Sequence, residues 1–356
     1  MVTSLRSDGS SRSRHWRPLL VVTATLLAAL LLGVAMTVGL DRRQRFPGTT
    51  TIGFPTCPPT TLTWRGQQEQ ELLQGNSGGT WDLRGAVWKG QPYPVQSEAW
   101  EKGCIEGGEV HGPIPEDETR DEWYDGQTTG PGGEGLRITM TGSTESWLLV
   151  QDMSVEDIED AYDPNAEGSS ARTYLDHVYA RDIRDDCIET EQPVHSVYVN
   201  NSFFDGCFAA FAQRPEEADS ASNGDTPADF TVENSLVYVE PQPLGENYCN
   251  DESVSRGRCV ARGEEWLGAY GIWKWSDMAA GRVEVRNTIF RLDMPSYTSC
   301  RAQVWPEGIY ENVTLVWAGA GDYGTAGECR NTLPEGVSLT TDLSVWDQAV
   351  TDWFSQ

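Results

Sequence analysis

The chain has 356 residues, 38% of them hydrophobic, and a formal net charge of −28. This length is enough to bury a large core in one domain or two. The negative charge argues against nucleic acid and anionic lipid as partners of the surface, because both are polyanions, and it favours solubility.

An apolar segment without charged residues spans residues 18–40. A helix of this length can cross the hydrocarbon core of a bilayer. The preceding arginines predict that residues 1–17 form a cytoplasmic basic tail and that the remainder is extracytoplasmic; they are Arg6, Arg12, Arg14 and Arg17. We favour an uncleaved transmembrane signal anchor, because a signal peptide usually has a shorter apolar region. Cleavage after Ala35 is the alternative and would make the protein secreted.

Eight cysteines lie beyond this segment. An even number in an oxidising compartment predicts disulfides, although the connectivity does not follow from the sequence. Pairing of chain neighbours is expected because each pair closes a modest loop: Cys57 with Cys104, Cys187 with Cys207, Cys249 with Cys259, and Cys300 with Cys329. The sequence has no Cys-x-x-Cys pair and only four histidines, so neither a zinc ribbon nor a histidine metal site is expected.

Residues 41–78 are expected to form a linker and an N-terminal cap, since the first part is rich in Pro and Thr. From residue 79 onwards, short alternating runs such as "TWDLRGAVWKG" are separated by Gly, Asp and Asn. Many short strands with polar turns are typical of an all-β sandwich, barrel or solenoid.

A repeated phrase decides among these three architectures. Val-x-Asn-Ser/Thr-apolar-apolar occurs at residues 199–204, 232–237 and 285–290, with a looser copy at 311–316. Its asparagines suit left-handed corners, where each side chain can bond its copy one coil away: Asn201, Asn234, Asn287 and Asn312. Spacings that differ only by polar insertions predict a solenoid over residues 79–337.

This pattern resembles the right-handed parallel β-helix (pectin-lyase-like) superfamily, which implies stacked coils of parallel strands. Two similar phrases, residues 185–188 and 205–208, then lie on successive coils. We expect Cys187 to stack on Cys207, and Ile188 on Phe208. If Ile188 and Phe208 face inward, both cysteines and Glu189 face outward.

Residues 338–356 change to a helical period, with five apolar residues on one face: Leu343, Trp346, Val350, Trp353 and Phe354. We interpret this segment as an amphipathic helix that caps the open end of the solenoid. The alternative is a helix that binds a partner.

The sequence Asp185-Asp186-Cys187-Ile188 is similar to part of the Gly-Asp-Asp-Cys-Ile motif of polygalacturonase-like glycoside hydrolases. The resemblance implies that Asp185 and Asp186 are the catalytic acid and base, with Asp205 as a third acid on the next coil. An inverting pair of carboxyl groups holds a water between them and is about 6.5–9.5 Å apart. The family's Asn-Thr-Asp, Gly-His-Gly and Arg-x-Lys phrases are absent here, so a turn or scaffold role for the aspartates is the alternative.

The pectate-lyase branch of the same fold suggests a second chemistry, in which carboxylates hold Ca²⁺ and an arginine removes a proton. Asp182 and Glu189 are then metal-ligand candidates, because calcium prefers oxygen ligands. Arg184 and Glu189 become candidates for substrate binding. The alternative is a solvated acidic face.

Aromatic residues crowd the stretch 264–278, and flat rings with polar rims suit sugars. The candidates for substrate binding are Trp266, Tyr270, Trp273 and Trp275. The alternative is that part of this set fills the coil interior.

Together these features predict a membrane-anchored, extracytoplasmic protein that binds a polysaccharide and is a candidate hydrolase or lyase. The expected partners are a polysaccharide and, through the N-terminal helix, a membrane, but not nucleic acid. No cofactor is required, and Ca²⁺ is the candidate metal. A non-catalytic cell-surface scaffold or adhesion module is the alternative.

Overall fold

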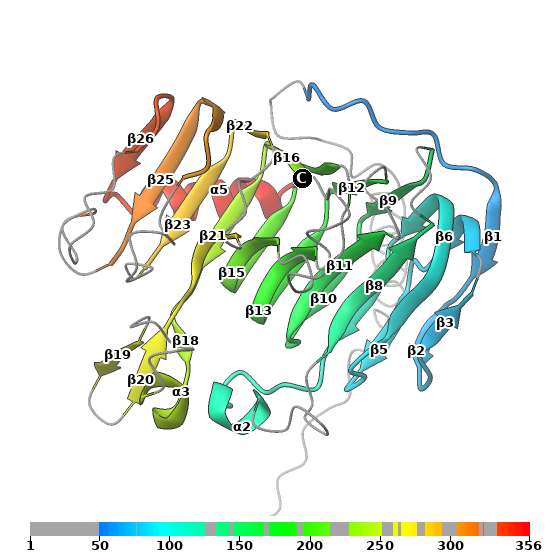
Figure 1. Cartoon of the computed structure of the whole chain (residues 1–356), viewed down its shortest axis with the longest axis horizontal. Helices are drawn as coiled ribbons and strands as arrows, with labels where there is room; N and C mark the ends of the chain where they lie inside the picture. The colour runs from blue at the N-terminus through cyan, green and yellow to red at the C-terminus, as the bar shows by residue number, and fades with distance from the viewer. Residues whose placement is uncertain are drawn as a thin grey trace, which may run out of the picture. The chain divides into compact units, whose positions relative to one another are not determined.

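The computed structural model describes residues 50–75, 77–124, 133–141, 145–166, 171–190, 194, 196–213, 228–250, 259–262, 265–275, 282–293, 305–319, 323 and 333–356. Residues 46–355 form one compact unit. Its main sheet has 23 strands, and the chain winds them into a nearly closed parallel β-solenoid (Figure 1). This confirms the stacked coils predicted from the asparagine phrase.

Three parallel stacks form the walls of the solenoid. The first sheet contains β1 (Thr60–Thr63), β4 (Ser77–Asp82), the second half of β6 (Val95–Glu106), β9 (Trp147–Gln151), β12 (Arg172–Asp176), β14 (Ser196–Asn200), β16 (Asp229–Glu233), β22 (Val283–Arg286) and β24 (Gly308–Glu311).

The second sheet contains β2 (Gly66–Gln68), β5 (Ala86–Lys89), β7 (Glu109–His111), β10 (Ser154–Glu156), the first halves of β13 (Tyr179–Thr190) and β15 (Phe203–Gln213), β17 (Leu236–Val239), β23 (Ile289–Leu292), β25 (Val313–Trp317) and β26 (Val337–Thr340).

The third sheet contains β3 (Leu72–Gln74), the first half of β6, β8 (Glu134–Met140), β11 (Asp160–Ala166), the second halves of β13 and β15, and β21 (Gly271–Trp275). A separate antiparallel sheet joins β18 (Gln242–Pro243), β19 (Cys259–Arg262) and β20 (Glu265–Gly268). Two short helices, α2 (Arg120–Tyr124) and α3 (Glu246–Asn250), lie near it (Figure 1).

Asparagines mark the corner that follows the first sheet, as expected. Asn201, Asn234, Asn287 and Asn312 all have positive φ, between 47° and 53°. The amide of Asn287 donates to the Oδ1 of Asn234 at 3.2 Å, and that of Asn312 donates to the Oδ1 of Asn287 at 2.9 Å. Asn tolerates the left-handed conformation and supplies the side-chain bond, so one residue type satisfies both demands of the corner.

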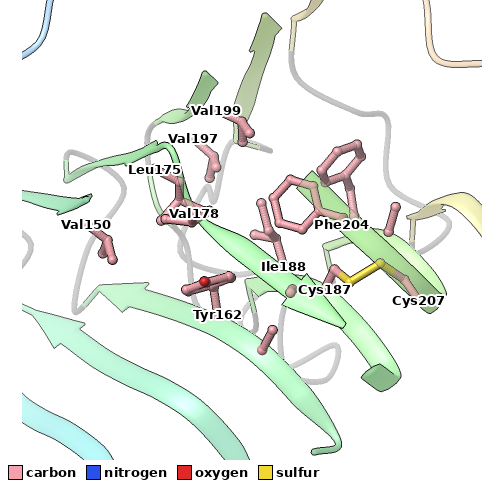
Figure 2. Close-up of a cluster of buried hydrophobic side chains, with 14 of the residues drawn as sticks. Val150, Tyr162, Leu175, Val178, Cys187, Ile188, Val197, Val199, Phe204 and Cys207 are labelled. Carbon is pink, nitrogen blue, oxygen red and sulfur yellow. A yellow bond between two sulfur atoms is a disulfide. The ribbon is translucent and has the colours of Figure 1, made fainter. Parts of the chain in front are cut away.

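Apolar side chains stack coil upon coil inside the three sheets. Val150, Leu175 and Val199 follow one another in register on the first sheet, and each is at most 1% exposed. Tyr162 and Ile188 face them from the third sheet (Figure 2). Burial of such side chains contributes about 1.5–3 kcal/mol each, which makes this interior the main source of stability.

The expected stacking around Cys187 is wrong in its register and in the faces of both cysteines and Phe208, whereas Ile188 faces inward as expected. The pairing of β13 with β15 shifts between Ile183 and Asp186, so Ile188 lies opposite Phe211 and not Phe208. Such a bulge interrupts the strict alternation of faces, so the neighbours Cys187 and Ile188 both face the core. Cys187 and Cys207 therefore point into the core, where their sulfurs bond (Figure 2), and Phe208 packs outside the coils against Tyr248.

Three of the four expected disulfides are present: Cys57–Cys104, Cys187–Cys207 and Cys249–Cys259. Cys300 and Cys329 lie outside the described residues. So does the predicted anchor at 18–40, and the described part of the chain contains no helix long and apolar enough to span a membrane.

The two terminal segments pack against the sides of the solenoid. Helix α5 (Ser344–Phe354) forms where predicted, but Trp346 and Trp353 pack on Phe203 and Leu236 of the second sheet. The helix therefore covers the side of the solenoid and not the open end that we expected. The reason is that apolar side chains on the outer face of the second sheet are buried by this contact. Residues 50–57, expected as linker, cross the outside of the first sheet (Figure 1).

Candidate functional site

Carboxylates gather on the outer face of the third sheet. Seven of them form what we call the acidic row: Glu134, Glu159, Asp160, Asp163, Asp185, Asp186 and Glu189. Register explains part of this grouping, because Asp160 pairs with Glu134 in the coil before it. The backbone N–H of Asp186, one coil later, donates to Asp160 Oδ1 at 2.8 Å. Parallel stacking thus brings together acids that are far apart in the chain.

Lys274 supplies positive charge to the centre of the acidic row. Its ammonium donates to Asp185 Oδ1 at 2.8 Å and to Asp186 Oδ2 at 2.6 Å. On the sheet Lys274 pairs with Ala212, which pairs with Glu189 one coil earlier. Because alanine is small, the lysine side chain can extend back across that coil to the two aspartates.

Arg120, the first residue of α2, supplies the second cation. Its Nη2 lies 2.9 Å from Asp185 Oδ2, and both side chains are less than 10% exposed. The guanidinium packs on four rings at about 5 Å, those of Trp123, Tyr124, Phe208 and Tyr248.

Hydrogen bonds join the N-terminal end of α2 to α3 and to the segment that precedes α3. Asp121 accepts hydrogen bonds at 2.7 Å from the backbone N–H groups of Asn247 and Tyr248. Its own N–H donates to the carbonyl of Leu244 at 3.1 Å. These bonds fix the helix that places Arg120 over the acidic row.

The two adjacent aspartates have opposite protonation preferences. Burial alone would raise the pKa of Asp185, but the charges of Arg120 and Lys274 hold it below the ordinary value. Burial, together with the charge of Asp185, holds the pKa of Asp186 well above its ordinary value. Burial and the charge of Glu189 raise that of Asp160 in the same way. Two neighbouring groups of opposite preference are the arrangement that acid–base catalysis requires.

Glu159 titrates near neutrality. Burial, followed by the charge of Asp185, raises its pKa to about 7. One carboxylate oxygen accepts a hydrogen bond from the N–H of Gly133 at 3.1 Å. This residue is therefore suited to exchange protons at physiological pH.

A polar cavity of about 400 Å³ lies on the same outer face, over β6 and β8. Its lining consists of Tyr93, Gln96, Ser97, Glu98, Arg137 and Thr139. Burial, and then the charges of Glu134 and Glu159, raise the pKa of Tyr93, which places the cavity beside the acidic row. Arg137, which lines the cavity, pairs with Glu134 of the acidic row at 2.9 Å and so connects the cavity to the row.

Three members of the row have the chemistry of a cation site. Asp160, Asp186 and Glu189 each offer an oxygen, and the three oxygens lie within 4.8 Å of one another. Asp186 Oδ1 is buried without a hydrogen-bond partner. The set fits a hard ion such as Ca²⁺, but the Lys274 ammonium already donates a hydrogen bond to the other oxygen of Asp186.

The predicted acids divide into two groups. Asp185, Asp186 and Glu189 meet in the acidic row, whereas Asp205 lies on the second sheet, where its Oδ2 is 3.5 Å from the hydroxyl of Tyr179. Asp182 pairs with Arg181 at 3.3 Å on that same sheet. The structure thus does not bring Asp205 or Asp182 to the paired aspartates.

Arg184 does not reach the acidic row either. Its side chain is buried, and Nη2 donates to the carbonyl of Pro115 at 2.6 Å. The residue anchors the segment that leads into α2.

The predicted aromatic residues lie in different environments. Trp273 points into the core, with its ring centre 4.9 Å from that of Phe211. Tyr270 is buried with Phe208 and Tyr248 outside the coils. Trp266 is half-buried on β20 of the small sheet, and the side chain of Trp275 lies outside the described residues.

Sequence reasoning missed Lys274 and Arg120. One signal was available for the lysine, since the chain has only three and this one lies between two tryptophans in a strand. A lone cation in such an apolar context predicts a buried partner of opposite charge. Nothing in the local sequence around Arg120 indicates its distant contact with Asp185.

Fold and site together define a parallel β-solenoid with a buried acidic row on one flank. Comparisons with protein families, with curated proteins and with solved structures found no match. The function therefore has to be argued from the site itself.

Proposed function

We propose that this protein binds a polysaccharide along the outer face of the third sheet and cleaves it. The contact of Asp185 and Asp186 with one buried ammonium, 2.8 and 2.6 Å from Lys274 Nζ, carries the proposal. The opposite directions of their pKa shifts agree with it. Glycoside hydrolysis needs one protonated carboxyl group at the leaving oxygen and one ionised carboxylate.

In this reaction Asp186 is the proton donor and Asp185 is the ionised partner. Both bond the same Lys274 nitrogen, at 2.8 and 2.6 Å. Their bonded oxygens are therefore closer than the roughly 6.5–9.5 Å of an inverting pair and favour the shorter spacing of a retaining mechanism. Retention replaces the inversion that the polygalacturonase resemblance implies.

The polar cavity over β6 and β8 is the proposed binding region for the sugar chain. Its polar lining offers hydrogen bonds to hydroxyl groups, and Arg137 offers a cation to an acidic sugar. The parallel sheet extends this surface beyond one sugar unit, since coils repeat about every 4.8 Å.

We place the solenoid outside the cell, held by a transmembrane anchor at residues 18–40. Three disulfides support an oxidising compartment. A right-handed, pectin-lyase-like winding is part of the proposal, because crossovers between parallel strands are right-handed in nearly all proteins.

No cofactor is required in this scheme. Ca²⁺ is the metal that Asp160, Asp186 and Glu189 suit, and a lyase would use it to hold an acidic sugar. Full activity in a strong chelator would support hydrolysis without metal, whereas loss of activity and its recovery with calcium would favour the lyase chemistry.

The test is a digestion screen of the purified full-length protein against a broad panel of polysaccharides. The proposal predicts new reducing ends from at least one glycan, and it predicts that Asp186→Asn lowers the rate at least a hundredfold. Unsaturated products would assign elimination in place of hydrolysis. If no glycan is cut, cleavage is rejected.

A second candidate function is a non-catalytic surface scaffold or adhesion module. It rests on the burial of the pair, since the side chain of Asp185 is 8% exposed and that of Asp186 is 0% exposed. In this case the Lys274 contacts only fasten one coil to another. Glycan binding without cleavage, unchanged in Asp186→Asn, would favour this candidate.

A further inference from the structure

A short stack of aromatic rings runs across the outside of the first sheet. The rings of Tyr174 and Tyr198 stack with centres 4.8 Å apart and an angle of 12° between their planes. Phe54, from the N-terminal segment, contacts the ring of Tyr174 at 6.0 Å. The two tyrosines are paired residues of β12 and β14, so the sheet register holds the stack in place.

The stack stops at β14, whereas the sheet continues for three more strands, β16, β22 and β24. The next residue in register after Tyr198 is Thr231 on β16, and the one after that is Glu284 on β22. Coils are about 4.8 Å apart, so roughly 10 Å separates the backbones at Tyr198 and Glu284. Since threonine is much smaller than tyrosine, a space about one ring thick remains above Thr231.

A cavity of about 320 Å³ occupies this position. We call it the tyrosine pocket. Its lining includes Thr51, Tyr198, Asp229, Thr231, Arg282 and Glu284. The N-terminal segment forms one wall because Glu233 of β16 accepts hydrogen bonds from Thr50 and Thr51. Figure 1 shows that segment passing over this part of the first sheet.

Charged groups surround the open side of the tyrosine pocket. The backbone N–H of Arg282 donates to Asp229 Oδ1 at 2.7 Å, and its guanidinium pairs with Glu284. The side chain of Arg282 is 65% exposed, so it can also reach a ligand. Two carboxylates and one guanidinium next to a ring can satisfy a ligand with several hydroxyl groups.

We propose that the tyrosine pocket binds one pyranose ring of a carbohydrate, stacked on Tyr198 in place of the missing side chain. Its hydroxyl groups donate to Asp229 and Glu284 and accept from Arg282. A nucleotide fits poorly, because its phosphates would face the two carboxylates. This site lies on a different sheet from the acidic row, so it binds sugar without cleaving it.

Three variants of the full-length protein test the proposal. Thr231→Tyr completes the aromatic stack and fills the tyrosine pocket, Tyr198→Ala removes the stacking surface, and Tyr198→Phe keeps the ring. The probes are hexasaccharides of cellulose, chitin, xylan and homogalacturonan, with affinity measured by titration calorimetry.

We expect at least one hexasaccharide to bind the wild type. Tyr198→Ala should weaken the affinity of the tyrosine pocket at least tenfold, and Tyr198→Phe should keep it within threefold. Thr231→Tyr should abolish binding to the tyrosine pocket and leave binding on the third sheet unchanged. Thr231→Tyr should unfold at the wild-type temperature or higher, which separates a blocked site from a damaged fold. The proposal is overturned if none of the four sugars binds, or if binding is the same in Thr231→Tyr as in the wild type.

This outcome is independent of the proposed cleavage. Asp186→Asn should retain the binding that Thr231→Tyr loses. Conversely, if no glycan is cut, the proposed cleavage is rejected, and the binding measurement alone still tests the tyrosine pocket. Binding lost in Asp186→Asn but kept in Thr231→Tyr would assign the sugar to the third sheet and refute the tyrosine pocket.

Discussion

The ammonium of Lys274 lies 2.6 Å from Asp186 Oδ2, although 88 residues separate them in the chain. Breaking a buried ion pair from one side leaves an uncompensated charge and costs about 3–5 kcal/mol. We therefore expect Lys274→Met to lower the free energy of unfolding by that amount, as measured in urea.

Lys102→Met is the matched control for this measurement. Lys102 also pairs with a carboxylate, Glu145, at 2.6 Å, but both side chains are exposed. Exposed pairs contribute little, so this variant should unfold close to the wild-type midpoint. An equal decrease in the free energy of unfolding for Lys274→Met and Lys102→Met would show that the Lys274 contacts are not a buried network.

The stability of the protein should fall as the pH rises from 5 to 8. The pKa of Glu159 is raised from 4.5 to about 7, mainly by burial and then by the charge of Asp185. Between these values the folded protein holds a proton that the unfolded chain has released, so the free energy of unfolding decreases with pH. Raised pKa values at Asp160 and Asp186 act in the same direction.

Asp185 does not offset this trend. Its pKa is lowered, so its contribution to stability is lost only at pH values below its ordinary value of 3.8. Thermal unfolding at several pH values checks the expectation, with a higher midpoint at pH 5 than at pH 8. Glu159→Gln should make the fall of the midpoint with pH shallower, since Asp160 and Asp186 still contribute to it. A midpoint that rises with pH in the wild type would contradict the assigned shifts.

Asn234 should be sensitive to both its backbone and its side chain. It has a φ of 52°, donates to Asn200 Oδ1 at 2.9 Å and accepts from Asn287 at 3.2 Å. Asn234→Gly keeps the corner but loses these two bonds, at a cost of about 1–3 kcal/mol. Asn234→Ala should cost about 1–2 kcal/mol more, because Ala disfavours this corner. Identical unfolding energies for the two variants would mean that the corner conformation contributes nothing.

Two of the described disulfides should differ in their contribution to stability. Cys187–Cys207 closes 20 residues inside the core, and its replacement by two alanines should cost about 3 kcal/mol or more. Cys249–Cys259 closes 10 residues beside the small antiparallel sheet, which can open locally. The corresponding double alanine variant should leave the main unfolding transition nearly unchanged. The reverse order of stabilities would contradict the placement of Cys187 in the core.

The solenoid was predictable because its corner residues repeat in the sequence. Each left-handed corner favours asparagine for local conformational reasons, so the same short sequence recurs once in each coil. The inward turn of Cys187 was not predictable, because the bulge between Ile183 and Asp186 depends on pairing with β15 and not on the local pattern. One shifted residue was enough to turn both cysteines inward and Phe208 outward.

The acidic row could be predicted only in part, for a related reason. Asp185, Asp186 and Glu189 are close in sequence and appear together in any local reading. Lys274 reaches them across two small residues, Ala209 and Ala212, on the intervening coil, and Arg120 reaches Asp185 from a helix outside the coils. Such contacts depend on tertiary geometry, which also separates Asp205 from the pair.

The most direct test of the proposed function is the release of reducing ends from polysaccharides by the wild-type protein and by Asp186→Asn, with Asp205→Asn as a comparison. We predict cleavage by the wild type, a loss of at least a hundredfold in Asp186→Asn, and a much smaller change in Asp205→Asn, since Asp205 lies on the second sheet beside Tyr179. Wild-type rates in Asp186→Asn would contradict the central claim that the paired aspartates on the third sheet are the catalytic groups.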